Sequence, residues 1–169
     1  CNQCHLDQTL DWTAGHLLDW HDIPVPEIPD EHKTVAAALI WALKGDAGQR
    51  ALIAWSMSWK PAQQASRTDW LPLFLGQTLL DPYDAVRFIA GRSLRAQPGY
   101  SDLSYDYVGP IEDRVAAAHK VREQWRSTHS QPPDAADQSL LINGPGQVNA
   151  SEFSRLVDQR DETPLNLAE

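Results

Sequence analysis

Hydrophobic residues recur along most of this chain at the three- and four-residue spacing of an amphipathic helix. No stretch of useful length alternates apolar and polar residues as a half-buried strand does. We therefore predict an all-α fold. The predicted helices span residues 13–20, 34–44 (starting near residue 30), 47–59, 70–80, 83–96 and 111–127, and a last one runs from about residue 150 to 161.

Cap and turn residues set the expected ends of these helices. Asp46 is the expected N-cap of the helix from residue 47, and Asp81 is expected to cap the next, with Pro82 at its first helical position. Asp30 is a weaker N-cap, because the lysine three residues later cannot complete a capping box. A Lys-Pro pair is expected to close the helix that ends at residue 59.

The helical spacing also predicts which side chains face the interior, and Met57 is interpreted as core filler rather than as a metal ligand. Seven tryptophans are present, and most are expected in the core. The predicted inner faces consist of Leu52, Trp55, Ser56 and Trp59; of Val86, Ile89, Ala90, Ser93 and Leu94; and of Val115, Ala118, Val121, Arg122 and Trp125, with Trp41 also buried.

The segments between helices have distinct compositions. Residues 22–29 are rich in proline and favour an extended polyproline II connector. Residues 130–137 have the composition of a linker, and the short apolar run 140–142 precedes a turn at 143–146. Asn149, followed three residues later by a glutamate, resembles a capping box, and the tail 163–169 is expected to be extended.

Length and charge exclude several classes of protein. With 169 residues, 42% hydrophobic and 22% charged, the chain suits a packed domain of ordinary size. Its net charge of −9 disfavours binding to nucleic acid. No apolar run is long enough for a transmembrane segment, and two cysteines cannot form a disulfide-rich scaffold.

The chain opens with the motif Cys1-Asn2-Gln3-Cys4-His5. C-x-x-C-H is the attachment signature of c-type haem. Two thiols about one helical turn apart reach the two vinyl groups of one porphyrin, and the adjacent imidazole ligates the iron from the proximal side. A thiol redox pair would favour a βαβ context, and a zinc site would need further paired ligands. We therefore predict covalent haem c held by Cys1, Cys4 and His5.

The sixth ligand of the iron is not fixed by the motif. His16 follows His5 at a distance that lets the chain pass round the edge of the haem, so it is the candidate for the distal ligand, although it could instead serve a different haem. An ordinary surface histidine is the alternative at each such position. The other candidates are His21, His32, His119, His129 and Met57.

The first residue is itself part of the motif, and no initiator methionine or signal peptide precedes it. We interpret the sequence first as the C-terminal piece of a longer protein, then as a processed chain, and lastly as a lipoprotein. Lipid modification of Cys1 would consume a thiol that haem attachment needs.

Two predicted helix pairs, 31–44 with 47–59 and 69–80 with 82–96, repeat at an offset close to that of HEAT repeats. In the second pair a Val-Arg step at Val86 and Arg87 is expected to place the valine in the core and the arginine near the surface. A plain antiparallel helical bundle is the alternative. The predicted organisation is a haem segment with its connector (1–29), a HEAT-like helical domain (30–129) and a linker, short helix and tail (130–169).

The opening segment 1–14, the turn 45–51, residues 81–94 and residues 160–164 together resemble the C-terminal part of bacterial multihaem c-type cytochromes with HEAT repeats. The resemblance implies a periplasmic or extracellular electron carrier that matures after export and has further haems upstream or in another chain. This sequence contains a single C-x-x-C-H motif.

Electron transfer to a redox partner protein is thus the leading hypothesis, and the acidic charge favours a basic partner surface. Asp7, Asp11 and Asp19 flank the motif. A haem-dependent oxidoreductase acting on a small nitrogen or sulfur species, with His16 and His21 as local acid–base groups, is the second hypothesis. A HEAT-type interaction module is the third, and the tryptophans are typical of interfaces as well as cores.

Overall fold

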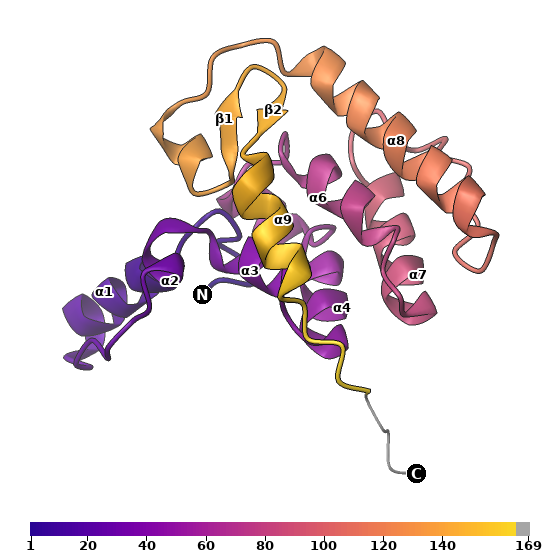
Figure 1. Ribbon diagram of the computed structural model, residues 1–169. Helices are drawn as coiled ribbons and strands as arrows, with labels where there is room; N and C mark the ends of the chain where they lie inside the picture. Colours follow the sequence, from indigo (N-terminus) through magenta and orange to yellow (C-terminus); the bar gives the residue numbers. More distant parts are fainter. Residues whose placement is uncertain (165–169) are drawn as a thin grey trace.

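The computed structural model describes residues 1–164, except for the side chains of residues 135 and 136, and these residues are mostly helical (Figure 1). The predicted all-α class is confirmed, and the predicted tail lies for the most part outside the described residues. The helices are α1 (Leu10–His21), α2 (Glu31–Thr34), α3 (Ala37–Leu43), α4 (Ala47–Ser56), α5 (Lys60–Ala65), α6 (Leu71–Thr78), α7 (Asp84–Arg95), α8 (Ile111–Thr128) and α9 (Ala150–Asp158), with a 3₁₀ turn, η1, at Ala135–Gln138.

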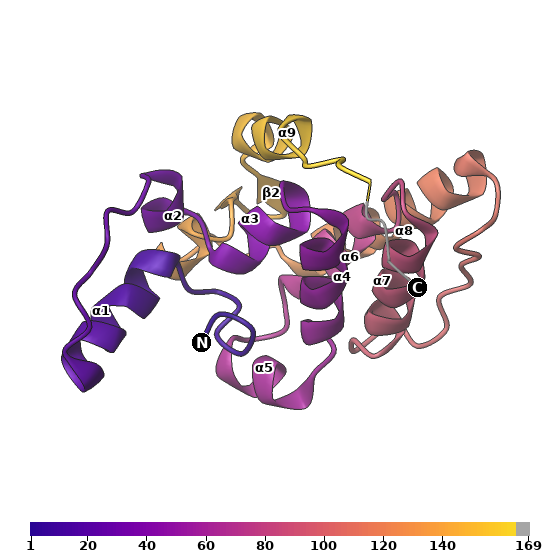
Figure 2. The same ribbon diagram turned by 90° about the horizontal axis from the view of Figure 1, so that it is seen from below.

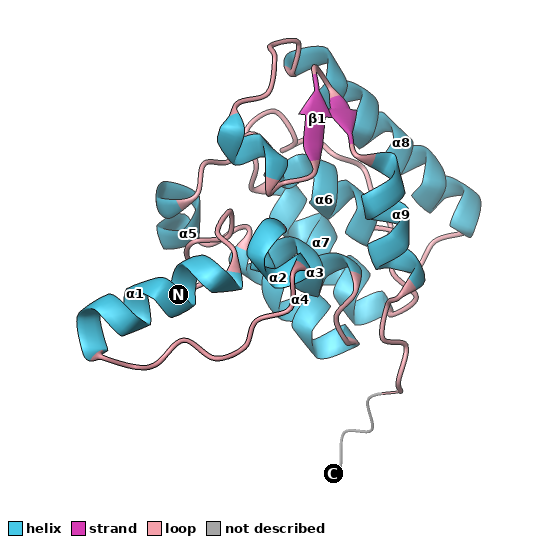
Figure 3. Cartoon of the chain, turned by 60° about the vertical axis from the view of Figure 1, so that its left-hand side comes forward, coloured by secondary structure: helices cyan, strands magenta, loops and turns pink. Residues whose placement is uncertain are grey.

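Among the described residues, strands occur only as one short hairpin, which the sequence did not predict (Figure 3). β1 (Ile142–Gly144) pairs with β2 (Gln147–Val148) in antiparallel fashion, with Ile142 opposite Val148. It encloses the turn that the sequence predicts at residues 143–146. The apolar run before the turn is buried and anchors the hairpin on the core.

Helices α3, α4, α6 and α7 form the centre of the molecule. α3 packs against α4, α6 packs against α7, and the two pairs contact each other through α4 with α7 and α3 with α6. α8 covers α6, and α9 lies against α3 (Figures 1 and 2). α1 contacts α2 and projects from one end of this body.

The predicted helix from residue 30 to 44 is interrupted. Val35 and Ala36 are extended, so α2 ends at Thr34 and α3 begins at Ala37. The N–H groups of Ala36 and Ala37 donate to the carbonyls of Ser139 and Gln8, and these long-range bonds replace the helical ones. Asp30 lies at the predicted N-cap but makes no cap hydrogen bond; its carboxylate accepts from Lys33 Nζ at 3.0 Å.

Helix α4 is capped as predicted but packs through a different face. Asp46 accepts from the Gln49 N–H, and the Gln49 side chain completes a capping box. The predicted inner residues Leu52, Trp55 and Trp59 are 40–44% exposed. The face that meets α3 and α7 instead carries Arg50, Ile53, Ala54, Ser56 and Met57, all buried, so the predictions for Ser56 and Met57 are confirmed.

The predicted end of the same helix is also wrong. α4 ends at Ser56, and the Lys-Pro pair begins the short helix α5 rather than closing α4. Proline fits there because its ring is tolerated in the first turn of a helix. Trp55 and Trp59 stack on each other at the surface, with ring centroids 5.7 Å apart.

Helices α6, α7 and α8 lie close to their predicted positions. In α7 the predicted inner residues are buried, with Ile89 half-buried. In α8 only Val121 and Trp125 are buried, whereas Val115 and Arg122 are exposed, because α8 reaches over α6 mainly with its second half. Gly76 of α6 permits this approach, since a Cβ there would lie 2.8 Å from the Val121 side chain.

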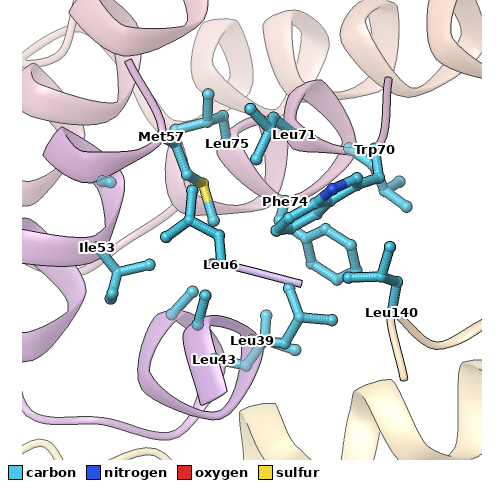
Figure 4. Packing of buried hydrophobic residues seen from close by; sticks show 14 of the residues in the cluster. Leu6, Leu39, Leu43, Ile53, Met57, Trp70, Leu71, Phe74, Leu75 and Leu140 are labelled. Atoms are coloured by element: carbon cyan, nitrogen blue, oxygen red, sulfur yellow. The ribbon is translucent and has the colours of Figure 1, made fainter. Parts of the chain in front are cut away.

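The hydrophobic core joins all three predicted segments of the chain. Leu6 lies at its centre, close to Met57, Leu39 and Phe74 (Figure 4). Leu140 and Leu156, from the segment after residue 129, belong to the same cluster. The N- and C-terminal segments are therefore packed parts of this structure. No helix among the described residues is long and apolar enough to cross a membrane.

A buried ion pair joins helix α4 to the turn that precedes α7. Arg50 donates through Nε to one Asp81 oxygen at 2.6 Å and through Nη2 to the other at 3.2 Å, and both side chains are at most 3% exposed. Arg50 Nη1 also donates to the carbonyls of Gly45 and Asp161. Asp81 is therefore an ion-pair partner, and the prediction that it caps the next helix is wrong.

The start of α7 changes accordingly. Tyr83 is its N-cap residue, and the Asp81 carboxylate accepts from the Tyr83 N–H at 2.9 Å. Val86 is buried as predicted, but Arg87 is only 8% exposed and is not near the surface. Its guanidinium donates to three backbone carbonyls, those of Asp81, Pro82 and Tyr107. These bonds offset the cost of burying the charge.

Replacing Arg50 with methionine is expected to lower the free energy of unfolding by about 3–5 kcal/mol, because the substitution leaves the Asp81 charge buried without its partner. Urea denaturation followed by circular dichroism measures the effect. The same substitution at the exposed Arg92 is the control and should cost less than about 0.5 kcal/mol. Equal losses in the two variants would contradict the structural role of the pair.

A second group of charges fixes α9 on the body. Glu31 accepts from Lys44 Nζ at 2.6 Å and from Arg155 Nη2 at 2.9 Å, and Arg155 also pairs with Glu152. The hydrogen bond from Lys44 lowers the pKa of Glu31 against the opposing effect of partial burial, and Arg155 lowers it further. The hydrogen bond from Arg155 likewise lowers the pKa of Glu152.

Because the pKa of Glu31 is lower in the folded chain than its ordinary value of 4.5, its contribution to stability is present above that pH and is lost as the pH falls below it. Glu31→Gln is expected to flatten this acid-induced loss. The measurement is the urea-derived free energy of unfolding between neutral and acid pH, with the exposed Glu112→Gln as control. An unchanged pH dependence in Glu31→Gln would show that the group does not contribute.

Candidate haem attachment site

The C-x-x-C-H motif forms a single helical turn. The N–H groups of Cys4 and His5 both donate to the Cys1 carbonyl, at 3.0 and 2.9 Å. Residues at positions i, i+3 and i+4 of such a turn lie on the same side. Both cysteines are free thiols; Cys1 is exposed, and Cys4 and His5 are half-buried. The backbone therefore places both cysteines and the histidine within one turn.

The buried side chain of Asn2 ties this turn to the start of α1. Asn2 Nδ2 donates to the carbonyls of Gln8 and Thr9 at 3.0 and 3.3 Å, and Asn2 Oδ1 accepts from Thr13 Oγ1 at 2.7 Å. Thr9 in turn is the N-cap of α1, where its hydroxyl accepts from the Trp12 N–H. The motif and α1 therefore form one hydrogen-bonded unit.

Leu6 anchors the other end of the motif. It follows His5 directly and is fully buried, at the centre of the core (Figure 4). Full burial of a leucine side chain contributes about 1.5–3 kcal/mol. The motif is consequently held at a fixed place on the body by a hydrogen-bonded asparagine on one side and a buried leucine on the other.

Four aromatic rings form a column along α1. The His5 ring lies 4.9 Å from that of Trp12, Trp12 lies 4.3 Å from His16, and His16 stacks on Trp20 at 4.7 Å. Trp12, His16 and Trp20 share one face of α1 because they are four residues apart. The predicted proximal and distal residues, His5 and His16, are therefore brought to the same column, on either side of Trp12.

His16 has one nitrogen available for further bonding. Its Nδ1 atom is buried and has no hydrogen-bond partner. The assignment of His16 as the distal ligand stays a prediction. The other candidates lie elsewhere: His21 is exposed at the end of α1, His32 is beside Glu31, His119 is exposed on α8, His129 stacks on Trp125, and Met57 is in the core.

Two hollows border the motif and α1. One, of about 370 Å³, is lined by Cys1 together with Trp41 of α3 and Leu52 of α4. The other, of about 490 Å³, is almost entirely apolar and runs between α1 and the proline-rich connector, with Leu17 and Ile23 among its lining residues. Hollows of this size with a mainly apolar lining are typical of small-molecule sites, and neither is lined by Cys4 or His5.

The residues present fit a covalently held haem. Two free thiols and an imidazole stand at the spacing that thioether attachment and proximal ligation require. The described residues contain no cluster of three or more His, Cys, Asp or Glu side chains arranged for a metal ion.

Comparison of the chain with models of protein families, with curated proteins and with solved structures gives no match. The function is therefore inferred from the residues of the site itself.

Three residues that support the motif were not predicted to do so. Asn2 lies between the cysteines and carries no motif information, and the burial of Leu6 depends on helices that follow far along the chain. Trp12 could have been found from its spacing of four residues to His16 and of eight to Trp20, which places the three rings on one side of a helix.

Asn2→Ala is expected to loosen the motif, because it removes three hydrogen bonds that connect the turn to α1. A loss of about 1.5 kcal/mol corresponds to an approximately ten-fold faster alkylation of the half-buried Cys4 in the haem-free, reduced protein. Iodoacetamide labelling followed by mass spectrometry measures this rate. Gln3→Ala, at an exposed position of the same turn, should leave the rate unchanged; a similar acceleration there would refute the role of Asn2.

Proposed function

We propose that this chain is an electron-transfer domain that binds one covalent haem c through Cys1, Cys4 and His5. The observation that carries the proposal is the single helical turn that contains Cys1, Cys4 and His5, with both thiols free. Cys1 and Cys4 would form the two thioethers, and His5 would ligate the iron from the proximal side. When bound, the haem supplies reversible one-electron chemistry.

The protein's own contribution is to position and shield this group. Asn2 and Leu6 fix the turn, so that the proximal imidazole is held before the iron binds. Trp12 packs against His5 with an apolar ring rather than with an acid or a base.

The helical body supports the proposed likeness to cytochromes with HEAT repeats. Two helix pairs lie side by side, with first helix beside first helix (α3 and α6) and second beside second (α4 and α7), as stacked repeats do. We propose on this basis a HEAT-like body in a larger multihaem protein, exported to the periplasm or the cell exterior. Haem c is expected there because its attachment follows export.

The test is production of the chain with a cytochrome c maturation system in an exporting host. The purified protein is expected to be coloured and to exceed the polypeptide mass by one haem. Cys1→Ser combined with Cys4→Ser should abolish covalent attachment, whereas His119→Ala, at an exposed histidine, should not. A colourless product with two alkylatable thiols would refute the proposal.

The absorption spectrum of the same product tests the distal ligand. Six-coordinate, low-spin iron that becomes high-spin in His16→Ala is expected if His16 is the sixth ligand. A low-spin spectrum that His16→Ala leaves unchanged would exclude His16. Five-coordinate, high-spin iron in the unaltered protein would favour the oxidoreductase hypothesis over the carrier.

A further inference from the structure

The segment that carries the haem motif differs in charge from the rest of the molecule. Residues 1–32 contain no lysine or arginine, although the whole chain has 14. Five carboxylates lie in residues 1–29, and none of them forms an ion pair with another described residue. They are Asp7, Asp11, Asp19, Asp22 and Glu27.

This acidic segment is also the part of the structure that stands furthest from the body. α1 projects from one end, and the proline-rich connector returns beside it (Figures 1 and 2). Asp11, Asp19 and Asp22 on α1 and its C-cap are exposed. A protruding surface without cations produces a negative potential that attracts a positively charged partner over several ångströms.

The tip of α1 is apolar as well as acidic. Trp20 is 62% exposed and Ile23 is 48% exposed, which are large values for such side chains. Ile23 and Leu17 border the apolar groove between α1 and the connector. An apolar centre with a charged rim, and an aromatic residue at its centre, is the usual composition of a protein–protein interface.

The exposed Trp20 is connected to the haem motif by the aromatic column. The rings of Trp20, His16, Trp12 and His5 follow one another at centroid distances of 4.7, 4.3 and 4.9 Å. Electron tunnelling is faster through rings in van der Waals contact than through solvent-filled gaps. The same tip that would receive a partner therefore leads, ring by ring, to the proposed iron ligand.

We infer that the tip of α1, centred on Trp20 and rimmed by Asp19 and Asp22, is the docking surface for a one-electron carrier protein with a lysine-rich face. Asp11, in the first turn of the same helix, adds to the negative potential of this surface. This inference rests on the proposed function. With haem bound, the reduced centre of the partner would supply one electron, and Trp20, His16 and Trp12 would provide the packed path to the iron ligand His5. No bond is broken, and no proton has to move.

The experiment uses the haem-loaded protein and a lysine-rich cytochrome c in which zinc replaces iron. The photoexcited zinc porphyrin gives one electron to ferric haem, so the decay of its triplet state reports the rate of electron transfer. Calorimetry on the same pair gives the affinity. Acetylation of the lysines of the zinc protein provides a partner of the same shape without the positive charge.

The triple variant D11N/D19N/D22N is expected to lower the bimolecular quenching constant about ten-fold at low salt and to flatten its dependence on ionic strength. Asparagine is tolerated at residue 22, where φ is +53°. The control variant D102N/D113N/D158N removes the same charge at exposed positions outside the haem segment and should retain the original rate and salt dependence. Acetylation of the partner should lower the quenching constant of the original protein, and flatten its salt dependence, as much as D11N/D19N/D22N does with the unmodified partner.

Trp20→Leu tests the route separately from docking. It is expected to weaken binding, because Trp20 is at the centre of the docking surface. It is also expected to slow electron transfer within the complex, which is measured at saturating partner so that the lost affinity does not contribute. Equal effects of the two triple variants, or quenching that does not depend on salt, would overturn the inference. So would light scattering that shows a dimer dispersed by Trp20→Leu, because a second copy would then occupy the tip.

The two proposals fail in different ways. A product without covalent haem refutes the carrier itself, whatever the partner does. A haem-loaded product whose electron exchange is insensitive to the α1 carboxylates leaves the carrier intact and refutes only this docking surface.

Discussion

The buried guanidinium of Arg50 is the interaction on which the arrangement of the helices depends. It joins four places in the chain: its own helix α4, the turn at Gly45, the carboxylate of Asp81 before α7 and the carbonyl of Asp161 near the C-terminus. A charge so fully removed from water is tolerated only when its donors are satisfied, which restricts all these segments to one relative position. The contact of α4 with α7, and the path of the chain after α9, follow from that restriction.

The haem motif inherits its fixed position from this body. Leu6 enters a core built by α3, α4 and α6, and the N–H of Ala37, at the start of α3, donates to the Gln8 carbonyl just after the motif. The motif is therefore hydrogen-bonded to the same helix that packs against α4. A disturbance at the buried ion pair would reach the motif through α3, because the interior is close-packed and transmits displacement.

Much of the fold could be predicted from local sequence. The parts that could not be predicted share one cause. Periodicity located α6, α7 and α8, and Asp46 was correctly identified as a cap, because these features depend on neighbouring residues. The break at Val35 depends on hydrogen bonds from distant segments. Asp81, which precedes a proline, has the sequence pattern of a helix cap, and only the fold shows that Arg50 pairs with it instead. The same limit applies to the site. Its reactive residues are adjacent in sequence and could be predicted, whereas the residues that hold them in place depend on distant parts of the chain and could not.

The proposed covalent attachment would explain why a site of this kind can lie at the edge of the structure. A haem held by contacts alone needs a deep pocket, whereas thioethers keep it in place with only one face covered by protein. Cys1 is exposed, and the motif lies between the body and the projecting α1. Both features agree with a haem that has only one face covered by protein. Because the motif lies at the base of α1, the two ends of this helix have different roles. Near its first turn, Thr13 Oγ1 donates to Asn2, and in its last turn Trp20 is exposed to solvent. A single helix thus connects the proposed iron ligand to the exposed Trp20 through three consecutive ring contacts.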